Sequence, residues 1–376
     1  MKRILLSLVV TLYAATALAC SPVKTKALVQ KPKPVIQLAI LLDTSNSMDG
    51  LIDQARTQLW RVVNEFGTAR KDGAMPELQV ALYEYGNDSL PAEGGHIRRV
   101  LPFTTDLDKV SEELFALKTN GGQEYCGQVI GEAVSGLQWS ASANDLKVIF
   151  IAGNEEFTQG NVDFRKTTAA AVGRGIIVNT IFCGDQLQGK QTQWGDGAKL
   201  AEGSYVAIDH NAEIVEIDAP QDDEIARLGA KLNETYIAYG AKGVEGMTRQ
   251  NAQDKNIAVR KGANVQRQIA KTSANYTNSS WDLVDASKSG SVEIEKVKTT
   301  DLPKEMRGMS VEQRKAHVRA TEQKRTEIKA QIAKLDAERK KFVAEKRKQL
   351  PAAASTLDEA IIQSVRAAGA KRGFTF

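Results

Sequence analysis

The feature that most constrains this chain is an apolar run that ends abruptly in a polar turn. Residues 35–42 (VIQLAILL) are apolar at all but one position and have the length of a strand, and Asp43-Thr-Ser45-Asn-Ser47 follows at once. One carboxylate and two hydroxyl groups thus stand at alternate positions just past the predicted strand. Such hard oxygen ligands suit a divalent cation such as Mg²⁺, in a site that leaves positions open to water or to a partner's carboxylate. The alternative is an ordinary turn in which Asp43 or Ser45 caps the following helix.

The residues that follow alternate between helical and strand patterns. Strands are predicted at 78–85, 99–104, 146–151 and 175–182, and helices at 51–66, 106–118, 125–138 and 161–173. The two later strands are continuous apolar runs, which is typical of strands buried on both faces. The alternation predicts an α/β fold with a doubly wound, mostly parallel sheet. Ligands of such a sheet bind beyond the carboxyl ends of its strands, where the Asp43 turn stands.

Motif and context together resemble the metal-ion-dependent adhesion site of von Willebrand factor type A (VWA) domains. In that family the pattern found here at Asp43, Ser45 and Ser47 closes the first strand and opens the first helix. The resemblance implies a VWA domain over residues 35–240. It also implies a divalent cation, Mg²⁺ or Mn²⁺, as cofactor and a protein ligand as partner.

Two positions depart from the family pattern. VWA domains generally complete the site with a Thr after a Gly-Gly pair and an Asp just beyond the fourth strand, whereas this chain has Gln123 and Gly153 there. Replacement oxygens are available from neighbouring positions, namely Glu124, Asn154 or Glu155. We therefore expect a degenerate metal site formed by Asp43, Ser45, Ser47, Glu124 and Glu155.

The N-terminus predicts export to the bacterial envelope. A basic start (Met1-Lys-Arg) precedes an apolar segment, Ile4 to Ala19, that is too short to span a bilayer, so residues 1–19 are interpreted as a signal peptide. Cys20 follows at once and resembles the lipidated cysteine of a lipobox, with residues 20–34 as a tether. We expect a periplasm-facing lipoprotein, with the outer membrane favoured over the inner membrane. The alternative is a soluble periplasmic or secreted protein, because Ala17-x-Ala19 also suits ordinary signal peptidase.

The other two cysteines form an even pair in an oxidising compartment. Cys126 and Cys183 both belong, in this fold, to the metal-site edge of the sheet. Parity and placement together predict a disulfide between them. The alternative is two separate buried thiols.

The C-terminal region has a different character. Residues 241–308 predict a polar helix and a small β-hairpin, and residues 309–376 predict a long basic helix followed by a second helix. Heptad spacing of Ile328, Leu335 and Phe342 indicates a weak coiled-coil seam, interrupted by Arg325 and Arg339. We expect few core contacts to cross residues 240–246. The basic helix is interpreted as a solvated face, or else as a docking surface for an acidic partner or anionic lipid. A similar tail occurs in uncharacterised bacterial envelope VWA proteins, which this chain resembles.

Composition and motifs exclude several function classes. The chain has 376 residues, 42% hydrophobic and 26% charged, and its net charge of +4 without basic strands interleaved with aromatics gives no reason to expect nucleic acid as a partner. Its three histidines are scattered, and it lacks nucleotide-loop, metalloprotease and serine-hydrolase motifs. We therefore expect no catalytic residues and a non-enzymatic envelope protein that binds a protein partner. The alternatives are a scaffold with a vestigial metal site, and a metal-dependent hydrolase using Asp43, Glu124 and Glu155.

Overall fold

A six-stranded sheet organises the N-terminal half of the molecule. The computed structural model describes residues 33–212, 214, 216–350 and 355–376. The strands, in spatial order, are β4 (Ile97–Thr104), β3 (Glu77–Tyr85), β1 (Val35–Asp43), β5 (Leu146–Gly153), β6 (Ile177–Cys183) and β7 (Tyr205–Ile208). Only β4 is antiparallel to its neighbour. The predicted doubly wound, mostly parallel sheet is confirmed, and strand order reverses beside β1.

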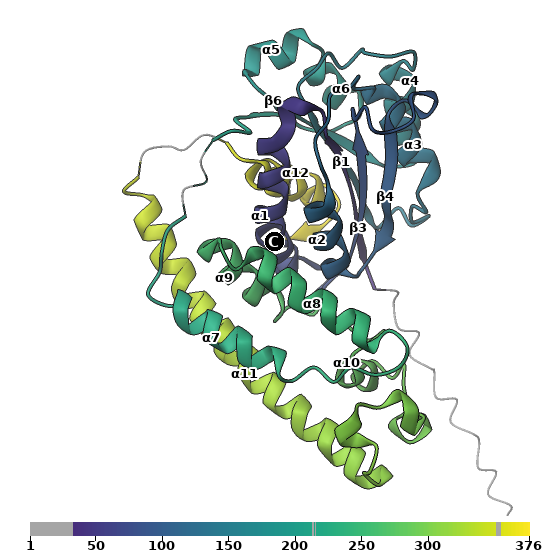
Figure 1. Cartoon of the computed structure of the whole chain (residues 1–376). Coiled ribbons are helices and arrows are strands. Elements are labelled where there is room, and N and C mark those ends of the chain that lie inside the picture. Colours follow the sequence, from purple (N-terminus) through teal and green to yellow (C-terminus); the bar gives the residue numbers. More distant parts are fainter. Residues whose placement is uncertain (1–32, 213, 215, 351–354) are drawn as a thin grey trace, which may run out of the picture. The chain divides into compact units, whose positions relative to one another are not determined.

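Helices cover both faces of this sheet, as Figure 1 shows. One face packs on α1 (Asp49–Thr68), α2 (Leu107–Ala116) and the C-terminal α12 (Leu357–Ala370). The other packs on α3 (Cys126–Gly136), α4 (Phe164–Gly173) and α6 (Trp194–Leu200). Alternate residues of each buried strand therefore enter two separate cores. The short helix α5 (Gln186–Gln191) lies between β6 and α6 in the chain.

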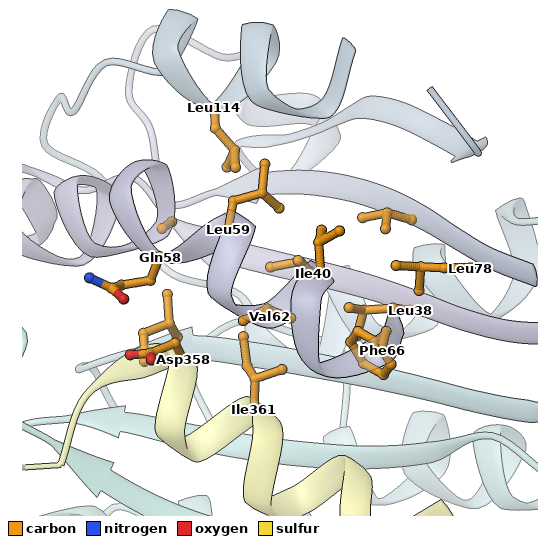
Figure 2. Close-up of a pocket in the computed structure, with 14 residues that line it drawn as sticks. Leu38, Ile40, Gln58, Leu59, Val62, Phe66, Leu78, Leu114, Asp358 and Ile361 are labelled. Carbon is orange, nitrogen blue, oxygen red and sulfur yellow. The ribbon is translucent and has the colours of Figure 1, made fainter. Parts of the chain in front are cut away.

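The last helix returns to the sheet and contradicts one expectation. In Figure 2, α12 closes an apolar cavity beside α1, with Ile361 facing Val62 and Leu38. After α12, β8 (Phe374–Thr375) pairs with β2 (Arg70–Lys71). Few core contacts were expected to cross residues 240–246, but one hydrophobic core runs from β1 to Phe374. That expectation was wrong because the apolar face of α12 is buried against α1.

Along the chain, the residues between β7 and α12 form a helical layer. It consists of α7 (Asp222–Asn233), α8 (Gly243–Ile257), α9 (Lys261–Ala270), α10 (Leu283–Lys288) and α11 (Val311–Arg347). Short 3-10 turns occupy 294–296, 299–301 and 304–306. The predicted β-hairpin within 241–308 is wrong, because Asp282 accepts a hydrogen bond from the Asp285 amide and caps α10.

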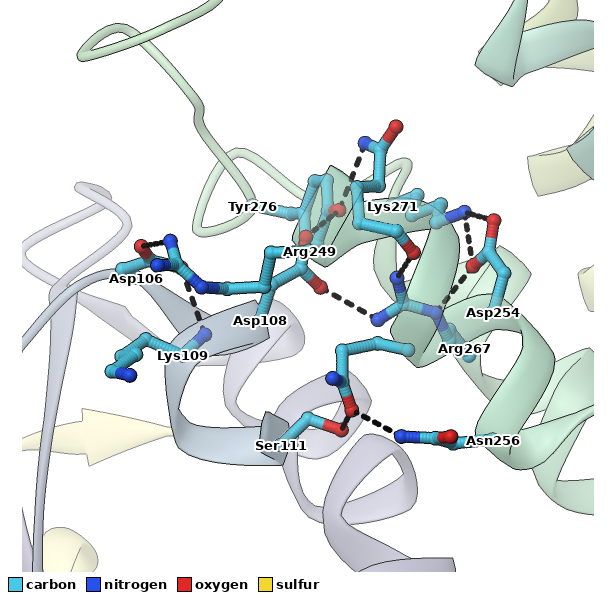
Figure 3. A network of polar contacts seen from close by, with 12 residues as sticks. Asp106, Asp108, Lys109, Ser111, Arg249, Asp254, Asn256, Arg267, Lys271 and Tyr276 are labelled. Atoms are coloured by element: carbon cyan, nitrogen blue, oxygen red, sulfur yellow. Dashed lines mark hydrogen bonds and ion pairs between the residues drawn. The ribbon is translucent and has the colours of Figure 1, made fainter. Parts of the chain in front are cut away.

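Buried ion pairs join this layer to the sheet domain, as Figure 3 shows. The Arg267 guanidinium, fully buried on α9, donates to Asp108 Oδ1 on α2 at 2.7 Å and to Asp254 on α8. Tyr276 donates to the other Asp108 oxygen at 2.6 Å, and Lys271 Nζ lies 2.6 Å from Asp254. Every charge in this group therefore has an opposite charge in contact.

The long helix α11 contacts the rest of the chain along one stripe. Ile328 of the predicted seam, and Ile332 one turn after it, are buried in the core shared with α7 and α9, so they pack within the chain. The two arginines expected to interrupt the seam are paired: Arg325 with Asp282 at 2.6 Å, and Arg339 with Asp222 at 2.6 Å. Among the described residues, no helix is long and apolar enough to cross a membrane.

Candidate metal centre

The predicted motif lies where the sequence places it, at the carboxyl end of the central strand. Asp43 ends β1 with no exposed surface, and its Oδ1 accepts a hydrogen bond from the Ser45 amide at 2.8 Å. Ser45 and Ser47 follow, with their hydroxyl oxygens 3.5 Å apart. Neither the 3-10 turn at 46–48 nor α1 has a side-chain cap. The alternative of a helix cap therefore has no support, and the Asp43 Oδ2 atom stays available.

A second carboxylate reaches this turn from the loop between α2 and α3. That loop is tied to the motif, because the Asn120 amide donates to Thr44 O at 3.0 Å. A Cβ on Gly86 would lie 2.7 Å from Glu124 Cγ and 2.8 Å from Asp43 Oδ1. Gly86, whose φ of 76° also favours glycine, therefore leaves the space in which Glu124 and Asp43 converge.

At the position where the family pattern has a Thr, this chain has Gln123, and the side chain that enters the site comes one residue later, from Glu124. Gln123 is exposed, while Glu124 is buried with 4% of its surface exposed. The Glu124 amide donates to Gln159 Oε1, which fixes the backbone with the carboxylate turned inward. Glu124 therefore occupies the interior beside Asp43.

The departure at Gly153 has a steric cause. A Cβ there would lie 2.5 Å from Tyr85 Oη and 3.0 Å from Asp43 Oδ2, so no larger residue fits. Tyr85 ends β3 in register with Asp43, and its hydroxyl donates to Ala152 O at 3.0 Å. Tyr85 thus closes the side of the site on which the family pattern has an Asp. The sequence signal for it was a tyrosine at a strand end.

The loop after β5 supplies the rim of the site. Asn154 Nδ2 donates to Ser47 Oγ at 3.1 Å, and Asn154 Oδ1 is buried without a hydrogen-bond partner. Glu155 is exposed, and its negative charge acts on both buried carboxyls. Asn154 rather than Glu155 therefore makes the direct contact with the motif.

The two buried carboxyl groups lack counter-charges. Burial raises the pKa of Asp43 to about 7, although the hydrogen bond from Ser45 partly offsets this. Burial, and then the charge of Asp43, raise the pKa of Glu124 to about 8. Asp43 Oδ2 and Glu124 Oε2 are both buried without a hydrogen-bond partner. Orphaned buried carboxylate oxygens are costly unless protonated or paired with a cation.

These donors fit a hard divalent cation. The side chains that converge offer two carboxylates, two hydroxyls and the Asn154 amide oxygen, which is the ligand chemistry of Mg²⁺ or Mn²⁺ rather than of a soft metal. Across the described part of the chain, no three residues among His, Cys, Asp and Glu are grouped to hold a metal. A cation here would therefore depend on the serine hydroxyls as well as on Asp43 and Glu124.

The predicted disulfide is wrong for a geometric reason. Cys126 and Cys183 are both buried free thiols. Cys126 belongs to the core under α3 and α4, and Cys183 to the opposite core under α1 and α12. Both lie near the metal-site edge, but the sheet separates them. Cys20 and the signal peptide lie outside the described residues.

With this geometry established, comparison with known proteins identifies the domain. The sequence of residues 37–196 matches the von Willebrand factor type A domain family. The chain contains a VWA domain. A search of the curated proteins finds no match.

Solved structures with similarity to the VWA domain come from several organisms. An aerotolerance-related membrane protein of Bacteroides fragilis is 16% identical, with a TM-score of 0.32, and the match covers 46% of this chain and 92% of that one. The vWF domain of the pilus tip protein Mfa5 of Porphyromonas gingivalis is 11% identical, with a TM-score of 0.36 and coverage of 47% and 90%. Proximal thread matrix protein 1 from the mussel byssus, with a zinc-occupied MIDAS motif, is 10% identical, with a TM-score of 0.34 and coverage of 46% and 42%.

Proposed function

We propose that the VWA domain binds a protein partner in the bacterial envelope through a divalent cation. The observation that carries the proposal is the pair of orphaned, buried carboxylate oxygens of Asp43 and Glu124 at the end of β1. Asp43, Ser45, Ser47 and Glu124 would hold the cation, with Glu155 at the rim. When bound, the cation supplies a positive charge and open positions for an acidic side chain of the partner.

The protein's own residues prepare this surface. Tyr85 and Gly153 close the site on the sheet side, and Asn154 orients Ser47. Ser47 is exposed on the loop beyond the end of β1, which suits approach by a protruding side chain of another protein. The helical layer packs against the sheet domain, with α9 beside α1 and α8 beside α2. We keep residue 240 as the proposed end of the VWA domain in the chain, so α7 belongs to that domain by sequence and packs with α9 and α11 of the later chain.

Calorimetric titration with MgCl2 and MnCl2 tests the metal. Wild-type protein should bind one equivalent, Asp43→Asn should bind none, and Glu156→Gln, an exposed charge in the same rim loop, should bind as the wild type does. Absence of binding at millimolar cation would leave the alternative scaffold function. Pull-down from envelope extracts with and without EDTA then tests whether partner capture needs the metal. A screen with ester, phosphate and peptide substrates tests the proposed lack of enzymatic activity.

We further propose that the chain is a lipoprotein anchored through Cys20. A basic start, a short apolar segment and a cysteine directly after Ala19 support this. Mass spectrometry of the mature N-terminus decides it. A lipid-modified Cys20 is expected, and an unmodified Cys20 or Ser21 terminus would refute it in favour of a soluble periplasmic protein.

A further inference from the structure

A cluster of cations lies at the edge of the sheet opposite to the metal centre, where β1 and β5 begin. We call it the basic pole. It consists of Arg70, Lys71, Lys147, Arg174, Lys371 and Arg372. These residues come from β2, the start of β5, the end of α4 and the turn after α12. Segments distant in sequence are thus brought together with the same charge.

Hydrogen bonds to backbone carbonyls hold the basic pole together. Lys71 and Arg372 both donate to carbonyl oxygens in the turn at 143–144. Lys147 Nζ donates to the carbonyl of Arg174 at 2.7 Å. Three of the six cationic side chains, those of Lys71, Lys147 and Arg372, are therefore held near one another by neutral groups.

No carboxylate neutralises these charges. None of the six cations forms an ion pair within the described ranges, whereas Arg267, Arg325 and Arg339 of the helical layer do. Asp72, which follows Lys71 in the chain, is exposed and forms no ion pair with it, and Asp145 accepts from the Val35 amide at 3.0 Å and from Ser140 Oγ at 2.6 Å. Burial, and then the charge of Arg372, lower the pKa of Lys147. Like charges held in proximity favour an external anion.

We propose that the basic pole lies against an anionic lipid bilayer. Charge complementarity with anionic headgroups supports this occupant. So does the position of Val35, the first residue of β1, because the tether that begins at Cys20 joins the sheet at this same edge. β1 would then extend ~30 Å away from the lipid, with Asp43 at its far end, so the metal centre would face outward. The positive charges of the basic pole are present whether or not Cys20 is lipidated.

Vesicle co-sedimentation of the full chain tests the proposal. Vesicles of phosphatidylcholine with one third phosphatidylglycerol should bind more protein than pure phosphatidylcholine, and added salt should remove the difference. We call the gain in vesicle affinity that phosphatidylglycerol produces the anionic increment. The triple variant Lys71→Gln, Lys371→Gln, Arg372→Gln should weaken it roughly 100-fold, because each loss of about one and a half charges near the surface lowers the affinity about tenfold.

A matched control removes the same charge elsewhere. Arg319→Gln, Lys334→Gln, Lys341→Gln neutralises exposed positions of α11 and should change the increment less than about threefold, because charges beyond a Debye length are screened. Equal loss in both triples, or loss in the α11 triple alone, would overturn the proposal. So would binding to polyglutamate without binding to vesicles, or full displacement from vesicles by millimolar glycerol phosphate. If the first triple does not fold, Lys371→Gln alone should still lower the increment, by roughly fivefold.

Discussion

The candidate metal centre and the helical layer both bury charged groups, but only the helical layer pairs them with opposite charges. In the helical layer three buried arginines, Arg267, Arg325 and Arg339, each contact at least one carboxylate. At the metal centre, Asp43 and Glu124 are buried together without a cation. Paired charges fix how helices pack, whereas buried charges of one sign without a partner favour binding of an external ligand of opposite charge.

Removal of Arg267 should give the largest effect. Arg267→Met leaves two carboxylates, Asp108 and Asp254, without their main counter-charge in the interior, which should cost about 4 kcal/mol of unfolding free energy. Chemical denaturation measures it. Arg227→Met, whose partner Glu224 is on the surface, should leave the midpoint unchanged. Adding Asp108→Asn to Arg267→Met should recover part of the loss, and no recovery would contradict the role of pairing.

The unpaired carboxyls should make the cation-free protein less stable as pH rises. Because the folded-state pKa values of Asp43 and Glu124 are raised to about 7 and about 8, the folded protein holds protons that the unfolded chain releases near pH 4. Stability should therefore fall as the pH rises from about 4 to about 8, and then level off. Melting in EDTA across this range measures it. Asp43→Asn should flatten the profile, and an unchanged profile in that variant would contradict the assignment.

Local patterns predicted those parts of the molecule that local interactions determine. The alternation of apolar runs gave the parallel strands, and the turn at Asp43 was placed at the end of β1. What failed depended on distant contacts. Cys126 and Cys183 share an edge, but the sheet faces to which they belong depend on where α3 packs. Only the folded chain shows Tyr85 beside Gly153.

The C-terminal region failed for a similar reason. A polar helical pattern with arginines in the seam indicates an exposed helix, unless acids elsewhere pair with them. Asp282 and Asp222, which neutralise Arg325 and Arg339, come from other helices of the layer. The return of α12 to α1 joins segments about three hundred residues apart, as in the bond from the Leu357 amide to Gln54 Oε1 at 3.0 Å. No pattern within a window of the sequence contains that information.

A saturating divalent cation should reverse the loss of stability at high pH. It would give Asp43 and Glu124 the counter-charge that the ion-paired residues of the helical layer already have. Binding only to the folded state adds ~2.7 kcal/mol at one hundred times the dissociation constant. Differential scanning fluorimetry at pH 8 should show a higher melting temperature with MgCl2 or MnCl2 in the wild type and no shift in Asp43→Asn. A shift of equal size in both proteins would place the cation elsewhere.

Substitution of Glu155 should have the smallest effect on cation binding, and it tests which residues of the site contact the cation directly. It is exposed, but its charge acts on both Asp43 and Glu124, so Glu155→Gln should weaken Mg²⁺ binding only roughly two- to fivefold, as a screened charge does. Calorimetric titration beside Glu156→Gln, its exposed neighbour, measures the difference. If Glu155→Gln instead abolished binding as Asp43→Asn is expected to do, the rim loop would have to move inward and supply a direct ligand. The cation would then be held by three carboxylates that have no positively charged side chain beside them. The difference from the helical layer, where side chains pair with one another, would be larger.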